Sequence, residues 1–352
     1  MLGDDAENAA LETLFFPFAT NRLAWSEQPT LFLRARMGPS LTRFGNPAVL
    51  CEQTFKPEAD ALENAGLQVT AHAGLHESFP LVLVLPPRQR DEARALLARA
   101  VKAAESGGRV VAAASNNSGA RTLEADLARL TGSVESQSKH KCRVFWTPAL
   151  SAATVNAALV DEWLRLDAPR PILDGRYISR PGVFAWDRID PASELLAGEL
   201  SERLAGRAAD LGAGFGYLSV ELLQRCPGIT ALHLYEAEAR ALDLARSNLG
   251  GARVPIEFRW HDVAAGLPER YDVIVTNPPF HTGSGAEDPS LGRRFIAEAA
   301  RALNPGGRLW LVANRHLPYE NVLNASFGNV RTVTQRHGFK ILEATRAPGG
   351  RR

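Results

Sequence analysis

The sequence predicts two successive α/β domains, each built on a parallel sheet with helices on both faces. The chain has 352 residues, more than one hydrophobic core usually organises. Apolar runs typical of buried strands alternate with segments of helical periodicity in both halves. Residues 81–116 and 273–314 also share one pattern: an apolar strand, Pro-Pro, an amphipathic helix, Gly-Gly-Arg and a second apolar strand. The two halves therefore resemble two copies of one repeated unit.

The repeat gives specific expectations for each half. In the first, a strand is expected over 81–85 and a helix near 91–104. In the second, a strand is expected over 271–276 and a helix near 292–303. Between the halves, residues 166–190 are rich in proline and glycine, which predicts a linker or entry loop rather than a packed element.

The copies differ at the position before the two prolines, which is Leu85 in the first and Asn277 in the second. The first copy has lost this polar group, and it also lacks a glycine-rich turn between strand and helix. We therefore expect residues 1–168 to form a degenerate domain that serves as a scaffold or docks RNA. Residues 169–352 are expected to form the catalytic domain.

Composition excludes several classes of protein. The net charge of +1 gives no global sign of nucleic-acid binding, so any contact with RNA must be local, and Lys139, Lys141 and Arg143 form the best cluster for it. No apolar run approaches the ~20 residues of a membrane span, and the expected location is the cytoplasm. The cysteines have neither disulfide nor zinc-site spacing; they are Cys51, Cys142 and Cys226.

A glycine-rich turn follows the strand that ends near residue 211 and opens a helix expected over 217–225. Such a turn lets a ligand approach the backbone closely, and dinucleotide-binding enzymes use one too. Tyr217, however, stands where a dinucleotide fingerprint requires glycine or alanine. Asp210 before the turn favours S-adenosylmethionine (SAM), because its carboxylate can receive the SAM ammonium group directly or through water. The residues expected to bind SAM here are Asp210, Gly212, Gly214 and Gly216.

Acids follow the next two strands. Glu236 ends the strand 231–235 at the distance where an acid accepts hydrogen bonds from ribose hydroxyls, with Glu238 as a competitor. Asp262 follows the strand 256–260 and is placed to accept from the adenine amino group. Each acid alone could equally be a helix cap or a surface charge. Acids at the ends of successive strands favour a cofactor site.

Asn277-Pro278-Pro279-Phe280 is the most specific motif in the chain. An aromatic amino nitrogen is a poor nucleophile because its lone pair is delocalised into the ring. The Asn277 amide oxygen and the Pro278 carbonyl can accept its two hydrogens and stabilise the positive charge that develops on methylation. The prolines, Pro279 included, restrict the backbone. Phe280 offers a face on which a flipped-out base can stack.

His281 follows this motif and has two interpretations, a general base or a structural residue. The methylated nitrogen is acidic enough to lose its proton to water, so the chemistry does not require a base there. It also requires no metal and no covalent nucleophile, because a sulfonium is already an activated methyl donor and the enzyme chiefly aligns the reactants.

Taken together, these residues resemble a known family, the RsmC-type guanine-N2 methyltransferases of small-subunit (16S) ribosomal RNA, with the large-subunit RlmG type as a close relative. The resemblance covers nearly the whole chain. It implies two tandem Rossmann-like class I methyltransferase domains from a duplication, the first degenerate, and adds Phe184 and Asn277 to the residues that contact SAM. The matching stretches are 31–36, 51–55, 113–117, 180–184 with Asp190, 210–216, 277–281, 304–307, 312–314, 317–319 and 327–328.

We expect a monomer that acts on ribosomal RNA or on the assembled small subunit, with Pro279, Phe280 and His281 in contact with the base. The sequence leaves several alternatives open. One is methylation of large-subunit (23S) RNA. Protein glutamine and DNA adenine methyltransferases also present Asn-Pro-Pro-aromatic, although the aromatic is usually tyrosine. A catalytically silent RNA-binding assembly factor is a fourth, which the intact Asp210, Glu236 and Asn277 argue against.

Overall fold

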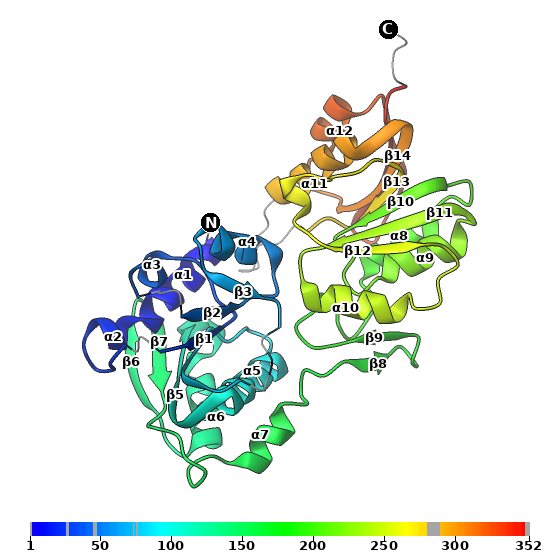
Figure 1. Cartoon of the computed structure of the whole chain (residues 1–352). Helices are drawn as coiled ribbons and strands as arrows, with labels where there is room; N and C mark the ends of the chain where they lie inside the picture. Colours follow the sequence, from blue (N-terminus) through cyan, green and yellow to red (C-terminus); the bar gives the residue numbers. More distant parts are fainter. Residues whose placement is uncertain are drawn as a thin grey trace. The chain divides into compact units, whose positions relative to one another are not determined.

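The computed structural model describes residues 2–25, 28–44, 48–72, 74, 77–279 and 289–348 (Figure 1). The chain divides into two compact units, one of Met1–Ala168 with Arg180–Gly182 and the other of Pro169–Ser179 with Val183–Arg352. Within the described ranges, no helix combines the length and hydropathy needed to cross a bilayer.

The first unit contains a seven-stranded sheet in the order β3-β2-β1-β4-β5-β7-β6. Its strands are β1 Thr30–Leu33, β2 Val49–Glu52, β3 Gln68–Thr70, β4 Phe79–Val84, β5 Ala104–Ser115, β6 Glu135–Lys139 and β7 Cys142–Trp146. Its helices are α1 Leu2–Leu14, α2 Phe16–Ala19, α3 Pro39–Phe44, α4 Lys56–Asn64, α5 Arg90–Ala103, the 3₁₀ turn η1 Asn116–Ser118, α6 Ala120–Thr131 and α7 Ala157–Trp163.

The second unit repeats this arrangement, with a seven-stranded sheet in the order β12-β11-β10-β13-β14-β16-β15. Its strands are β10 Ala205–Leu211, β11 Gly228–Glu236, β12 Ile256–Trp260, β13 Tyr271–Thr276, β14 Leu303–Asn314, β15 Asn329–Arg336 and β16 Phe339–Thr345. Its helices are α8 Pro191–Glu199, α9 Tyr217–Arg225, α10 Ala239–Asn248, η2 Val263–Ala265, α11 Pro289–Ala302 and α12 Glu320–Ser326, and a hairpin of β8 Arg170–Ile172 and β9 Tyr177–Ser179 precedes them.

When the strands of each seven-stranded sheet are numbered along the chain, both sheets have the same order across the sheet: third, second, first, fourth, fifth, seventh and sixth. This shared order confirms the prediction of two Rossmann-like domains. The prediction of parallel sheets needs one correction, because the last strand of each unit, β7 or β16, pairs antiparallel with both of its neighbours. It forms a hairpin with the strand before it and therefore needs no helical crossover.

The segment 166–190 is more ordered than predicted. It contains the antiparallel hairpin β8–β9, and Tyr177 in β9 is buried in the core of the second unit. Asn248 of α10 holds the hairpin, since its side chain donates to the Ile178 carbonyl and accepts from the Ile178 N–H. The prolines and glycines therefore mark short turns around a packed element rather than a free linker.

Strand register shows which residues of the two units are equivalent. Leu33 of β1 lies beside Val84 of β4, as Leu211 of β10 lies beside Thr276 of β13. One residue further on, Arg34 therefore corresponds to Gly212, and Leu85 to Asn277.

The first unit lacks the glycine turn because arginines replace two of its glycines, Arg34 at the position of Gly212 and Arg36 at that of Gly214. Arg34 keeps the left-handed backbone of its glycine counterpart, with φ 55°. Both arginines form ion pairs with Glu7 of helix α1. This half of the duplication has exchanged an open backbone turn for a charged cluster.

Candidate functional site

The glycine turn of the second unit lies at the carboxyl edge of its sheet, between β10 and α9. All three glycines have left-handed φ angles, 72° at Gly212, 56° at Gly214 and 91° at Gly216, which other residues rarely adopt. The N–H of Gly212 donates to the Tyr235 carbonyl at 2.8 Å. A Cβ built on Gly214 would meet no heavy atom of the described residues within 4 Å, so the backbone there faces open space.

Asp210, the acid before this turn, is fully buried. Its Oδ2 accepts from the Ser219 hydroxyl at 2.8 Å, which ties the end of β10 to α9, whereas Oδ1 is buried with no hydrogen-bond partner within the described residues. Burial, with a further contribution from the nearby Glu236 charge, raises the pKa of Asp210 to about 7. An unpartnered carboxylate oxygen beside an open glycine turn suits a cationic group or a bridging water.

Glu236 points into the same turn. Its Oε2 accepts from the Gly214 N–H at 2.7 Å, and its Oε1 accepts from the Glu238 N–H at 2.8 Å. Burial raises the pKa of Glu236 above its ordinary value. A carboxylate carries about four lone-pair sites, so Glu236 can bind both backbone groups and still accept from ligand hydroxyls.

The two other acids act as caps. Glu238, the competitor of Glu236, caps α10 by accepting from the Arg240 N–H at 3.2 Å and is ion-paired with the Arg240 side chain. Asp262 caps the 3₁₀ turn η2, with Oδ1 accepting from the Ala264 N–H at 2.8 Å. Capping uses one carboxylate oxygen of Asp262. The carboxylate lies at the end of β12 and can still accept a hydrogen bond from a ligand.

Asn277 follows β13, beside the glycine turn. A Cβ built on Gly212 would lie 4.0 Å from the Asn277 carbonyl oxygen, so the two motifs meet at the same edge of the sheet. The Asn277 Nδ2 donates to Asp190 Oδ2 and to Ser193 Oγ, each at 2.9 Å. Its Oδ1 is left as the atom that can face a substrate.

The rest of the motif is only partly covered by the structure. Pro278 is buried and Pro279 half-buried. Phe280 and His281 lie outside the described residues. Phe184, on the segment between β9 and α8, is 65% exposed and is available to cover a ligand.

In the first unit, the predicted basic cluster lies at the tip of the β6–β7 hairpin. Lys139 and Lys141 are exposed, and the Lys139 ammonium lies 4.2 Å from the centre of the Phe16 ring. Arg143 is different, because its guanidinium is ion-paired with Glu124 of α6. The structure therefore brings the lysines together as exposed charges and neutralises the arginine.

Sequence reasoning missed the roles of Asp190 and Ser193. A local signal was present: Asp190 followed by Pro191 is a typical helix start, with an N-cap acid and proline at the first helical position. That signal predicts the helix α8 but not the contact of its cap with Asn277, which is 87 residues away.

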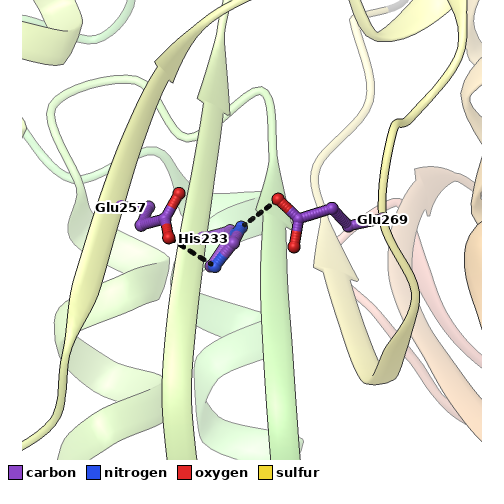
Figure 2. Close-up of side chains that lie close together, drawn as sticks. All are labelled: His233, Glu257 and Glu269. Atoms are coloured by element: carbon purple, nitrogen blue, oxygen red, sulfur yellow. Dashed lines mark ion pairs between the residues drawn. The ribbon is translucent and has the colours of Figure 1, made fainter.

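A second cluster of titratable groups lies on the sheet of the same unit, around the buried His233 of β11 (Figure 2). Glu257 Oε1 lies 3.7 Å from Nε2 and Glu269 Oε1 lies 3.8 Å from Nδ1. These side chains have the composition of a metal site, with ligand atoms within 4.8 Å of one another. Both carboxylates, however, are ion-paired with arginines, Glu257 with Arg259 and Glu269 with Arg207 and Arg259.

The histidine of this cluster is held neutral. Arg207 Nη2 lies 3.0 Å from His233 Nε2, and because a guanidinium only donates, Nε2 is the acceptor. Nδ1 then carries the proton and donates to the Tyr271 hydroxyl at 3.1 Å. The potential ligand nitrogen is thus already engaged, and the cluster is an ion-pair network.

We predict that this network makes folding sensitive to acid. Burial, reinforced by Arg207, lowers the pKa of His233 from its ordinary value near 6.5. As the pH falls below about 6.5, the unfolded chain takes up a proton at His233 and the folded chain does not, so the free energy of unfolding decreases. Urea unfolding at pH 7.5 and 5.5 should show a smaller decrease in this free energy for His233→Gln than for the wild type. An equal decrease would contradict the assignment.

Comparison with known proteins agrees with this geometry. The family model "Methyltransferase small domain" matches residues 174–343. The chain is 30% identical to the ribosomal RNA small subunit methyltransferase C of Cronobacter sakazakii over 84% of each chain, and 27% identical to that of Psychromonas ingrahamii over 86% of this chain and 87% of the relative. It is also similar to the solved T. thermophilus 16S rRNA N2 G1207 methyltransferase in complex with AdoMet and guanosine, with a TM-score of 0.76, 26% identity, and coverage of 96% of this chain and 91% of that one.

Proposed function

Because the chain belongs to the ribosomal RNA small subunit methyltransferase C family, we infer that it methylates the N2 amino group of a guanine in 16S ribosomal RNA with SAM as methyl donor. The observation that carries this proposal is the Asn277 amide, held beside the glycine turn with its oxygen turned away from α8. The target we propose is the guanine equivalent to G1207 of the T. thermophilus relative's substrate.

The second unit offers groups that fit the ammonium, the ribose and the adenine of SAM. SAM supplies a methyl group activated on a sulfonium. We assign the ammonium to Asp210, whose Oδ1 is buried without a hydrogen-bond partner among the described residues, and the ribose hydroxyls to Glu236. Asp262 is assigned to the adenine amino group. The exposed ring of Phe184 is assigned to covering the adenosine part of SAM.

Asn277 and Pro278 then act on the acceptor nitrogen. The Asn277 Oδ1 and the Pro278 carbonyl each accept one N2 hydrogen, which draws the lone pair out of the ring and aligns it. The lone pair attacks the methyl carbon, a C–N bond forms, and the C–S bond breaks with its electron pair remaining on sulfur. The positively charged nitrogen loses one proton to water, so no residue of the chain needs to act as a base.

We predict one SAM site per chain, in the second unit. Asp210→Ala should weaken SAM binding by about 1–3 kcal/mol, the usual loss for a hydrogen bond to a charged group. Because the pKa of Asp210 is about 7 in the folded chain, its carboxylate is neutral at lower pH and attracts the ammonium less. Calorimetry at pH 8 and pH 6 should show weaker binding at pH 6 for the wild type and little difference for Asp210→Ala. Two sites per chain would refute the assignment.

For the first unit we propose RNA docking through the exposed Lys139 and Lys141. Enzymes that act on one unstacked base must hold the polyanion around it, and contacts remote from the reacting atom can do so. The charged cluster of Arg34, Arg36 and Glu7 at the position of the glycine turn is consistent with a domain that no longer binds SAM.

The lysines should act through phosphates. Replacing Lys139 and Lys141 by glutamine should weaken RNA binding and lower the slope of log K against log salt by about 1.5, since each phosphate contact contributes roughly 0.7–0.9. Arg143→Gln is the matched control, because Glu124 already neutralises that charge. Filter binding at a series of salt concentrations measures both slopes, and a larger change for Arg143→Gln than for the lysines would contradict the proposal.

One experiment tests the function as a whole. Tritiated SAM is offered with small subunits, large subunits, naked 16S RNA, DNA and release factors, and the labelled species is digested to identify the methylated residue. We expect label in N2-methylguanosine from 16S RNA. Label in large-subunit RNA, adenine or protein would replace this function with one of the alternatives, and no transfer to any substrate would favour a non-catalytic assembly factor.

A further inference from the structure

We propose that Asp190 and Ser193 orient and polarise the Asn277 amide for methyl transfer, an inference that rests on the function proposed above. The Asn277 Nδ2 lies 2.9 Å from Asp190 Oδ2 and 2.9 Å from Ser193 Oγ. A carboxylate only accepts hydrogen bonds, so the amide nitrogen faces it and Oδ1 points the other way. The orientation that methyl transfer needs is set by helix α8 before any substrate binds.

Asp190 and Ser193 are themselves fixed. Asp190 is the N-cap of α8, and the same Oδ2 that receives Asn277 also accepts from the Ser193 N–H at 2.9 Å. Pro191 restricts the backbone at the first helical position. Leu196 and Ala197 anchor the helix in the core, and Ser193 is 9% exposed. Rigid support of this kind is what a preorganised electrostatic contact requires, because reorganisation during the reaction would cost part of its benefit.

The charge of Asp190 adds to its geometric role. A negative group on the nitrogen side of an amide draws the N–H bonds toward it and increases electron density on the oxygen. That oxygen accepts from the N2 amino group, which becomes positive as the methyl arrives. Asp190 therefore strengthens an interaction that matters most in the transition state, and we expect its loss to lower kcat rather than raise KM.

The duplicate supports this interpretation. Helix α1 of the first unit packs on β5 and β7, as α8 packs on β14 and β16. There the position of Asn277 is Leu85, which offers no amide, and Glu7 of α1 pairs with Arg34 and Arg36.

The test separates the contact with Asn277 from the helix cap. Serine caps helices about as well as aspartate, so Asp190→Ser should fold like the wild type, while its shorter, uncharged side chain removes the carboxylate that polarises Asn277. We expect its kcat on 16S RNA to fall by roughly tenfold or more while KM for SAM changes less than about twofold. Asp190→Asn keeps an acceptor oxygen without the charge, so its kcat should lie between that of the wild type and that of Asp190→Ser. Asn156→Ala, which removes the cap of α7, is a control that should leave kcat unchanged.

A double-mutant cycle shows whether Asp190 acts through Asn277. Adding Asp190→Ser to Asn277→Ala should lower kcat no further, because the amide it positions is gone. The same fold-loss in both backgrounds, or an unchanged kcat in Asp190→Ser alone, would overturn the proposal.

A second measurement does not depend on the substrate. The NMR signal of the Asn277 side-chain NH₂ should shift in Asp190→Ser, because the Asp190 carboxylate, one of its two acceptors, is lost; an unchanged signal would refute the contact itself. If the signal shifts but the wild type transfers no methyl to guanine N2, the proposed function fails and the Asp190–Asn277 contact stands.

Discussion

Asn277→Ala is expected to lower turnover on 16S RNA by about a hundredfold or more while leaving SAM affinity nearly unchanged. The scale is that seen when one preorganised contact to a developing charge is removed. SAM affinity should survive because the groups assigned to the cofactor lie on the glycine turn and at the ends of β11 and β12, not on the Asn277 side chain. Single-turnover methylation and calorimetry measure the two quantities separately.

The duplicated unit supplies a matched control for this substitution. Leu85 occupies the position equivalent to Asn277 and is 3% exposed. Leu85→Ala should cost about 2–5 kcal/mol of stability through the cavity it leaves, yet the folded fraction should retain its turnover. A variant without the Asn277 side chain that methylates at the wild-type rate would remove the basis of the mechanism.

The elements around the site were predictable because their local signals are strong. The predicted bounds of β12, β13 and α9 coincide with the observed ones, 256–260, 271–276 and 217–225. Two of them begin or end where local chemistry requires it: α9 begins directly after Gly216, whose φ is 91°, and β13 ends before a proline pair that cannot continue the ladder. The duplication was visible for the same reason, since Pro-Pro and Gly-Gly-Arg mark equivalent turns.

Long-range partnerships were not predictable from the sequence. The contact of Asp190 with Asn277 and that of Arg143 with Glu124 depend on which helix packs beside which strand. Sequence spacing gives no measure of that packing. The β8–β9 hairpin was missed because its strands have three residues each and proline and glycine surround them. Its stability comes from a buried tyrosine and from Asn248, both of which are tertiary features.

Gly214→Val is expected to abolish measurable SAM binding, a loss of a hundredfold or more. Gly214 has φ 56°, donates its N–H to Glu236 and faces open space. A β-branched residue is strained in this conformation, and its methyl groups would project from the turn into the space that we assign to the cofactor. The strain would also displace the N–H that holds Glu236, so one substitution removes both the room for SAM and the orientation of its ribose acceptor.

Strain alone could also weaken binding by destabilising the whole unit, and Gly306→Val separates the two causes. Gly306 has φ 78° and likewise no heavy atom within 4 Å of a built Cβ, but it lies in the first residues of β14, away from the glycine turn. Both variants should lose about 1–3 kcal/mol of stability from the same backbone conflict. Calorimetry should then show SAM binding in Gly306→Val and none in Gly214→Val. Equal weakening in the two variants would mean that the turn at Gly214 does not face the cofactor.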